Sequence, residues 1–150
     1  MSAQAIAKIF DLQGRRSHSE KELRAKLSKF FSKEEIEEAL LYAKDHRLID
    51  DPQELSERVA EGLRRKGKGI RFVNGYLAQK GLPPVKNNDQ EEIEVASTLL
   101  SKLKGRSKSK NGDKQKWALM LARRGFSPQA IHQVIGKVIG QQQEIDQTID

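Results

Sequence analysis

A short basic block is the densest group of chemically active side chains in this chain. Residues 64–71 read RRKGKGIR, with Gly67 and Gly69 separating five cations, Arg64, Arg65, Lys66, Lys68 and Arg71. Guanidinium and ammonium groups bind phosphates and carboxylates, and glycines leave room for a partner's backbone to come close. Cations at a helix end also complement the helix dipole without any partner. The block therefore predicts an anion-binding surface, and a solvated helix end is the simpler interpretation.

A second basic stretch covers residues 105–125, with seven cations against one acid. Its first part, GRSKSKNGD, has no apolar residue and is predicted to be a flexible loop that attracts polyanions without reading their sequence. Together the two blocks carry essentially the whole positive excess behind the net charge of +7, which indicates an acidic partner, usually nucleic acid. The further candidate contacts are Lys80, at the end of an earlier predicted helix, and Arg106, Lys108, Lys110, Arg123 and Arg124.

The residue types that catalysis or metal binding needs are missing or scattered. The chain has no cysteine, which excludes thiolate chemistry, disulfides and cysteine-ligated metals. Its three histidines, His18, His46 and His132, are isolated, and no phosphate-cradling GxxxxGK[ST] or GxGxxG motif occurs. We therefore predict a protein that is not an enzyme and that holds no cofactor and no metal.

The composition of the chain indicates where in the cell the protein acts. Hydrophobic residues make up 36% of the chain and the mean hydropathy is −0.72. No apolar run approaches the roughly 20 residues of a membrane-spanning helix, and the first ten residues lack the pattern of a secretory signal. We predict a cytoplasmic protein without a membrane partner.

Apolar residues recur at helical spacing along the whole chain, so the predicted fold is all-α. Among the residues that mark these helices are Phe10 and Phe30, and Trp117 has the spacing of a core residue. Most predicted helices start at capping side chains: Ser19 with Glu22, Ser32 with Glu35, Asp51 before Pro52, Asp89 with Glu92, and Ser127 before Pro128.

The sequence also resembles itself. LAQKGL, ending at Leu82, matches LARRGF, ending at Phe126, and a looser copy without the glycine ends at Phe31. Each copy ends a helix at a basic residue, with a glycine suited to the left-handed turn in two of them. We therefore predict tandem three-helix repeats in an elongated, curved array: repeat 1 over 1–49, repeat 2 over 50–88 with an abbreviated third helix, and repeat 3 over 89–150 with the basic loop 105–113 and a frayed tail.

Three stretches resemble the RecX family, the bacterial regulators of the RecA recombinase. Leu48-Ile49-Asp50-Asp51 is similar to the family's junction into its second unit, and KGKGIRFVNGYLAQKGL, residues 66–82, follows the family pattern RGxGxxxIxxxLxxKGI. LARRGFS, residues 121–127, is similar to the signature of the last unit. Each stretch is weak alone, but their order and spacing together are fairly specific and cover nearly the whole chain.

The resemblance implies a monomer that binds along the groove of the RecA filament on single-stranded DNA, with weak non-specific affinity for DNA itself. It further implies inhibition of filament growth, ATP hydrolysis, strand exchange and coprotease activity, and so a role in DNA repair, homologous recombination and the SOS response.

Two other classes of function stay open on the residues alone. Paired short helices also occur in direct DNA-binding proteins, whether transcriptional or architectural, and Arg71 and Asn74 are suitably early in a helix to meet base edges. A non-catalytic scaffold for an unrelated acidic protein is the third class.

Overall fold

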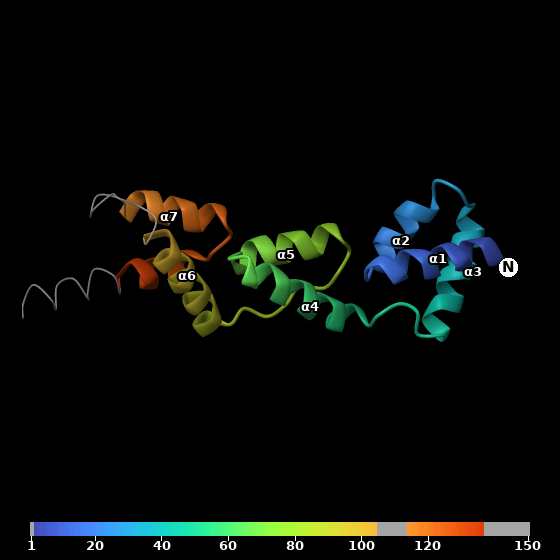
Figure 1. The fold of residues 1–150 in the computed structure, drawn as a ribbon, viewed down its shortest axis with the longest axis horizontal. Helices are drawn as coiled ribbons and strands as arrows, with labels where there is room; N and C mark the ends of the chain where they lie inside the picture. Colours follow the sequence, from blue (N-terminus) through green and yellow to red (C-terminus); the bar gives the residue numbers. More distant parts are fainter. Residues whose placement is uncertain (1, 105–113, 137–150) are drawn as a thin grey trace, which may run out of the picture. The chain divides into compact units, whose positions relative to one another are not determined.

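The computed structural model describes residues 2–104 and 114–136, and in these residues it contains helices and no strand. The all-α prediction is confirmed. The helices, drawn in Figure 1, are α1 (Ala3–Arg15), α2 (Glu20–Leu27), α3 (Lys33–Asp45), α4 (Pro52–Arg65), α5 (Ile70–Gln79), α6 (Asp89–Lys104) and α7 (Lys114–Arg123), followed by a helical stretch over 128–136.

The chain divides into two compact units. Unit 1 contains Met1–Val59 and Tyr76–Val85, and unit 2 contains Ala60–Gly75 and Lys86–Asp150. The division passes through α4 and α5, so each unit takes part of both helices. The three repeats of the sequence analysis, and their curved arrangement, stay predictions.

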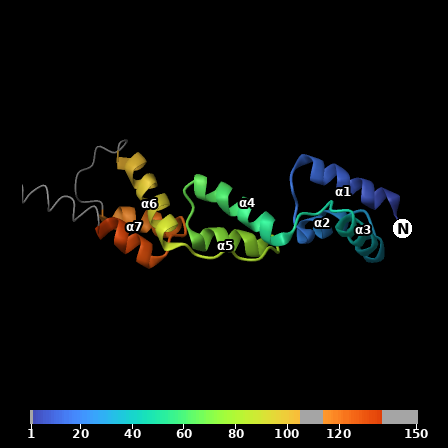
Figure 2. The same cartoon turned by 90° about the horizontal axis from the view of Figure 1, so that it is seen from below.

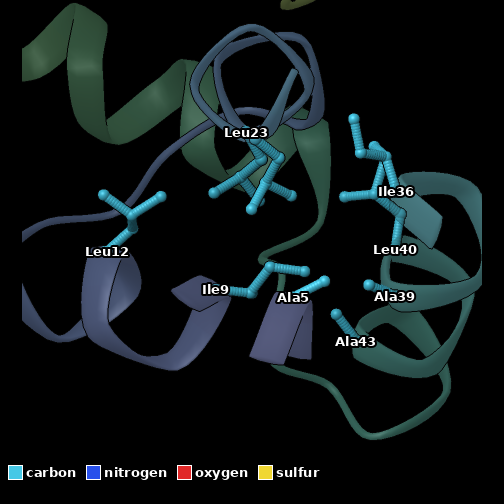
Figure 3. Close-up of a cluster of buried hydrophobic side chains, with 9 residues drawn as sticks. Ala5, Ile9, Leu12, Leu23, Ile36, Ala39, Leu40 and Ala43 are labelled. Carbon is cyan, nitrogen blue, oxygen red and sulfur yellow. The ribbon is translucent and has the colours of Figure 1, made fainter. Parts of the chain in front are cut away.

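The core of unit 1 is built by α1, α2 and α3, which gather at the N-terminal end of the chain in both ribbon views (Figures 1 and 2). Ile9 of α1, Leu23 of α2 and Leu40 of α3 are at most 1% exposed and point into one cluster (Figure 3). Ala5, Ala39 and Ala43 are fully buried beside them, and their small side chains let α1 and α3 approach closely.

The predicted helix starts are confirmed in unit 1. Ser19 with Glu22 and Ser32 with Glu35 both form complete capping boxes, in which each serine accepts from the third helical N–H and each glutamate accepts from the serine N–H. Asp51 caps α4, because its carboxylate accepts from the N–H of Glu54 at 3.2 Å.

Both copies of the repeated motif end a helix in the predicted way. Gly81 has a φ of 70° and Gly125 a φ of 91°. The next residue in each copy returns a hydrogen bond across the last turn: Leu82 N–H to Leu77 O at 2.8 Å, and Phe126 N–H to Leu121 O at 3.1 Å. This is the six-residue closure of a Schellman motif, which needs a residue that tolerates positive φ.

The core of unit 2 joins α6, α7 and the helical stretch 128–136. Phe126, at 1% exposed, lies in it, together with Ile93, Ala96, Leu100, Leu121, Ala130 and Val134. Trp117 packs partly buried against this core, which confirms its predicted structural role. Ser127 caps the last stretch by accepting from Ala130 N–H at 3.2 Å.

Three details differ from the sequence-based expectations. Phe10 and Phe30 are 54% and 71% exposed, because the core face of α1 uses Leu12 instead and α2 ends at the predicted core residue Leu27, before Phe30. Asn88, and not Asp89, caps α6, since its side-chain oxygen accepts from Glu91 N–H at 3.1 Å. Glu92 turns away from that cap to a different helix, described below. The segment 105–113 and the residues after 136 lie outside the described residues.

Candidate partner-binding surface

The basic block 64–71 ends α4 and begins α5, and all of it belongs to unit 2. Arg64 pairs with Glu91 at 3.2 Å, and Arg65 pairs with Glu61 one turn earlier on its own helix. Lys68 lies over the ring of Phe72, with its Nζ 4.5 Å from the ring centroid. The structure therefore already gives these three cations partners within the chain.

A groove of about 470 Å³ opens in unit 2 beside the end of α4. It brings Arg64, Arg65 and Lys66 together with Arg124, which lies 58 residues further along the chain. The Arg124 guanidinium donates to the Lys66 carbonyl at 3.3 Å, which holds the two basic blocks together. Three cations of the first predicted block and one of the second thus line one surface.

Apart from Gly67, helix α6 supplies the rest of the lining. Val95, Leu99 and Leu103 are apolar, Lys102 adds a fifth cation, and Glu94 is the single acid that lines the groove among the described residues. Lys102 is not among the contact residues predicted from the sequence. Its signal was present, because Lys102 follows Val95 by seven residues and so shares its face of the helix.

The start of α5 is closed by the protein itself. Gly69 N–H donates to Arg124 O at 2.8 Å and Arg71 N–H donates to Gly125 O at 2.9 Å. A Cβ on Gly69 would collide with the backbone of Phe126. The expectation that this glycine admits a partner's backbone is therefore wrong: the chain's own turn after α7 occupies that space.

The buried side chain of Glu92 also contacts the start of α5. It is 2% exposed, and its two carboxylate oxygens accept from Ile70 N–H at 3.1 and 3.2 Å. Burial raises the pKa of Glu92, although hydrogen bonds from the backbone of Ile70 and Ser127 and the charge of Arg64 oppose the rise. One carboxylate thus ties the start of α5 to the start of the stretch 128–136. The N–H groups of Ile70 and Arg71, the first two residues of α5, both donate within the chain and are therefore not left for an incoming phosphate.

Lys80 belongs to unit 1, where it contacts side chains of its own unit. Its Nζ lies 3.5 Å from a carboxylate oxygen of Glu22 and 5.6 Å from the ring centroid of Tyr76. Burial raises the pKa of Glu22, but hydrogen bonds from Arg16 and from the Ser19 backbone, with the charges of Arg16 and Lys80, outweigh it and lower the pKa to about 2. This ionic cluster stabilises unit 1.

The remaining candidates divide into exposed and undescribed residues. Arg71 and Arg123 have exposed side chains, but Arg71 lines a different groove of unit 2 and Arg123 lines neither. Arg106, Lys108 and Lys110 lie outside the described residues. Within the described part of the chain, no group of three or more acidic or histidine side chains is placed to hold a metal, and no helix is long and apolar enough to cross a membrane.

Packed helical units, one of which carries a cationic groove, define an all-α protein. A family model described as RecX, third three-helix domain, matches residues 89–135. Two proteins named Regulatory protein RecX match most of the chain. That of Chlorobium limicola is 33% identical, covering 90% of this chain and 89% of its own, and that of Chlorobaculum tepidum is 30% identical, covering 90% and 88%.

The chain belongs to the RecX family, as the three sequence stretches indicated. Solved structures agree on the fold. The crystal structure of RecX from Lactobacillus salivarius superposes with a TM-score of 0.74 at 22% identity, covering 91% of this chain and 97% of its own. A second RecX crystal structure gives a TM-score of 0.73 at 22% identity, covering 90% and 72%.

Proposed function

We propose that this protein modulates the RecA recombinase, most directly as an inhibitor, by binding the RecA filament on single-stranded DNA. The proposal is supported by family membership and by one observation in particular: Arg64, Arg65 and Lys66 of the first basic block and Arg124 of the second line one groove of unit 2. Lys102 adds a fifth cation there, and Glu94 is the one acid among the described lining residues. A cationic groove favours an acidic partner and accelerates its encounter.

In this mechanism unit 2 holds the protein on the filament through its groove. Bound protein occupies the space that duplex DNA or a cleavable repressor must enter, and it opposes the addition of further RecA. No step needs a catalytic group, a cofactor or a metal. The protein acts in the cytoplasm, as a monomer, in recombinational repair and the SOS response.

Direct reading of duplex DNA by α5 is less well supported by the geometry. A recognition helix meets base edges with its N-terminal residues. Here the first residues of α5 are packed against the turn at Gly125, and the N–H groups of Ile70 and Arg71 already have acceptors. The Arg71 side chain remains exposed, so weak non-specific contact with DNA is compatible with the structure.

The test is RecA-driven strand exchange between single-stranded circles and linear duplex, with the protein added at stoichiometric amounts. We expect product formation to fall, together with ATP turnover on single-stranded DNA. Unchanged exchange and unchanged turnover would refute the proposal. Tight, sequence-dependent binding to duplex without RecA would instead support the DNA-binding class.

A further inference from the structure

The groove of unit 2 has a cationic part and an apolar part, which suit an anionic and an apolar group of a ligand. One is cationic and comes from the end of α4, from Arg124 and from Lys102. The other is apolar and comes from α6, where Val95 and Leu99 are half-buried and pack on the edge of the unit 2 core. A ligand that fills this groove covers apolar surface and meets positive charge at once.

Three cations are available for a ligand's charge. In the described residues Lys66 and Lys102 form no ion pair, and Arg65 has only its exposed pair with Glu61. Exposed pairs of this type stabilise a protein only weakly, so a ligand carboxylate can compete for Arg65. Arg64 and Arg124 are less free, since each bonds to another part of unit 2.

A strand of nucleic acid satisfies only one half of this lining. Proteins that hold single strands in grooves combine cations with aromatic side chains on which the bases stack. None of the described residues that line this groove is aromatic. Phosphates and sugars gain nothing from Val95, Leu99 and Leu103, whose contact with a polar backbone would cost desolvation.

An acidic peptide with apolar side chains satisfies both halves. Val95, Leu99 and Leu103 follow one another at four-residue spacing, so they form a stripe along one face of α6. A partner helix or extended segment can lay apolar side chains on such a stripe, and carboxylates at its edges then reach the flanking cations.

We propose that this groove binds an acidic, apolar-patterned peptide segment of a partner protein, with its apolar side chains on the α6 stripe and its carboxylates at Arg65, Lys66 and Lys102. The inference rests on the proposed function, in which the partner is the RecA filament, and it assigns this groove to protein contact and not to the DNA strand.

The first experiment compares three labelled probes on the full-length protein by fluorescence anisotropy. They are a synthetic peptide of about twelve residues with Leu at helical spacing among Glu and Asp, an oligoglutamate of equal charge, and an oligodeoxythymidine of equal charge. We expect the patterned peptide to bind about tenfold more tightly than the oligoglutamate, because only the former covers the stripe. Equal binding of both peptides would overturn the proposal.

Matched charge variants locate the binding. Arg65→Gln with Lys102→Gln removes two charges from the groove, and Lys114→Gln with Lys116→Gln removes two exposed charges of the same unit outside the groove lining. We expect the first pair to weaken the patterned peptide about tenfold and the second pair by less than about twofold. Equal losses would show general charge attraction and would contradict the assignment.

Val95→Thr tests the apolar half, because threonine keeps the shape of valine and replaces a methyl by a hydroxyl. We expect about threefold weaker binding of the patterned peptide and no change for the other two probes. Thermal melting of each variant checks folding, and the comparison of probes on the unaltered protein decides the question even if a variant melts early. A variant effect on the oligodeoxythymidine alone would assign the groove to nucleic acid.

The two proposals fail separately. If the protein inhibits strand exchange but the patterned peptide shows no preference over oligoglutamate, the peptide assignment is wrong and RecA modulation stands. If the peptide binds as described and strand exchange is unaffected, the groove is a peptide site for another protein and RecA modulation is wrong.

Discussion

Arg47 is the non-glycine residue with a positive φ, 56°, among the residues that the structure describes. It closes the end of α3, where Leu48 N–H returns to Ala43 O at 2.8 Å, in the same way that Gly81 and Gly125 close theirs. A side chain in this conformation costs about 1–2 kcal/mol relative to an ordinary one. The motif therefore uses an unfavourable residue at this position.

Replacing Arg47 by glycine should stabilise the protein by about 0.5–1 kcal/mol, since the strain is relieved and the chain loses somewhat more entropy on folding. Urea unfolding measures the gain. Arg47→Ala is the matched control, because it removes the guanidinium but keeps the Cβ, and it should give no gain. Equal stabilisation by both variants would contradict the backbone explanation.

His18 is a buried titratable residue, 1% exposed, held between Arg16 and Lys26. Its Nδ1 lies 2.8 Å from the Arg16 carbonyl and its Nε2 lies 2.7 Å from Lys26 Nζ. Nδ1–H therefore donates to the carbonyl, and Nε2 accepts from the lysine as a neutral imidazole. Burial first, and then the charges of Arg16 and Lys26, lower the pKa of His18.

Because the pKa of His18 is lower in the folded than in the unfolded protein, protonation favours unfolding. The stabilisation is complete above about pH 6.5, the unfolded value, and is lost as the pH falls below it. We expect the free energy of unfolding of the wild type to decrease between pH 7 and pH 5 relative to His18→Gln, which cannot titrate. Parallel pH profiles for the two proteins would exclude this role.

At the scale of elements, Glu92 shows how one side chain connects helices distant in sequence. It lies in the first turn of α6, and its carboxylate accepts from the backbone N–H groups of Ile70 in α5 and of Ser127 before the stretch 128–136. Two helix starts thus depend on a carboxylate from a third helix.

Glu92→Ala should destabilise unit 2 by about 2–4 kcal/mol, because it leaves two buried N–H groups without acceptors. Hydrogen exchange should show faster exchange of the Ile70 and Ser127 amides. Glu94→Ala is the control on the same helix: its side chain is exposed, and the loss should stay within about 0.5 kcal/mol. Unchanged exchange at both amides would contradict the proposed link.

Much of the element scale was predictable, because helix starts and ends are local in sequence. The serine capping boxes, the proline at the start of α4 and the two closing glycines are each decided by residues within one turn. Glu92 was predicted as a local capping partner of Asp89, but it accepts from the N–H of Ile70, 22 residues away in the sequence. Such tertiary pairing leaves no local signal.

At the scale of the whole molecule, charge counting identified the two basic blocks but not what they form together. Arg124 and Arg64 meet in one groove only because the turn after α7 packs on the start of α5. Lys80 holds the same position in LAQKGL that Arg124 holds in LARRGF, but it is paired with Glu22 in unit 1. Helical periodicity could have found Lys102, whereas the meeting of the two blocks required the fold.

The central claim is that the groove of unit 2 holds the protein on the RecA filament. ATP turnover by RecA on single-stranded DNA, titrated with the wild type and with the two matched double variants, tests it most directly. We expect Arg65→Gln with Lys102→Gln to need about tenfold more protein for half-maximal inhibition, and Lys114→Gln with Lys116→Gln to behave as the wild type. Equal inhibition by all three proteins would contradict the claim.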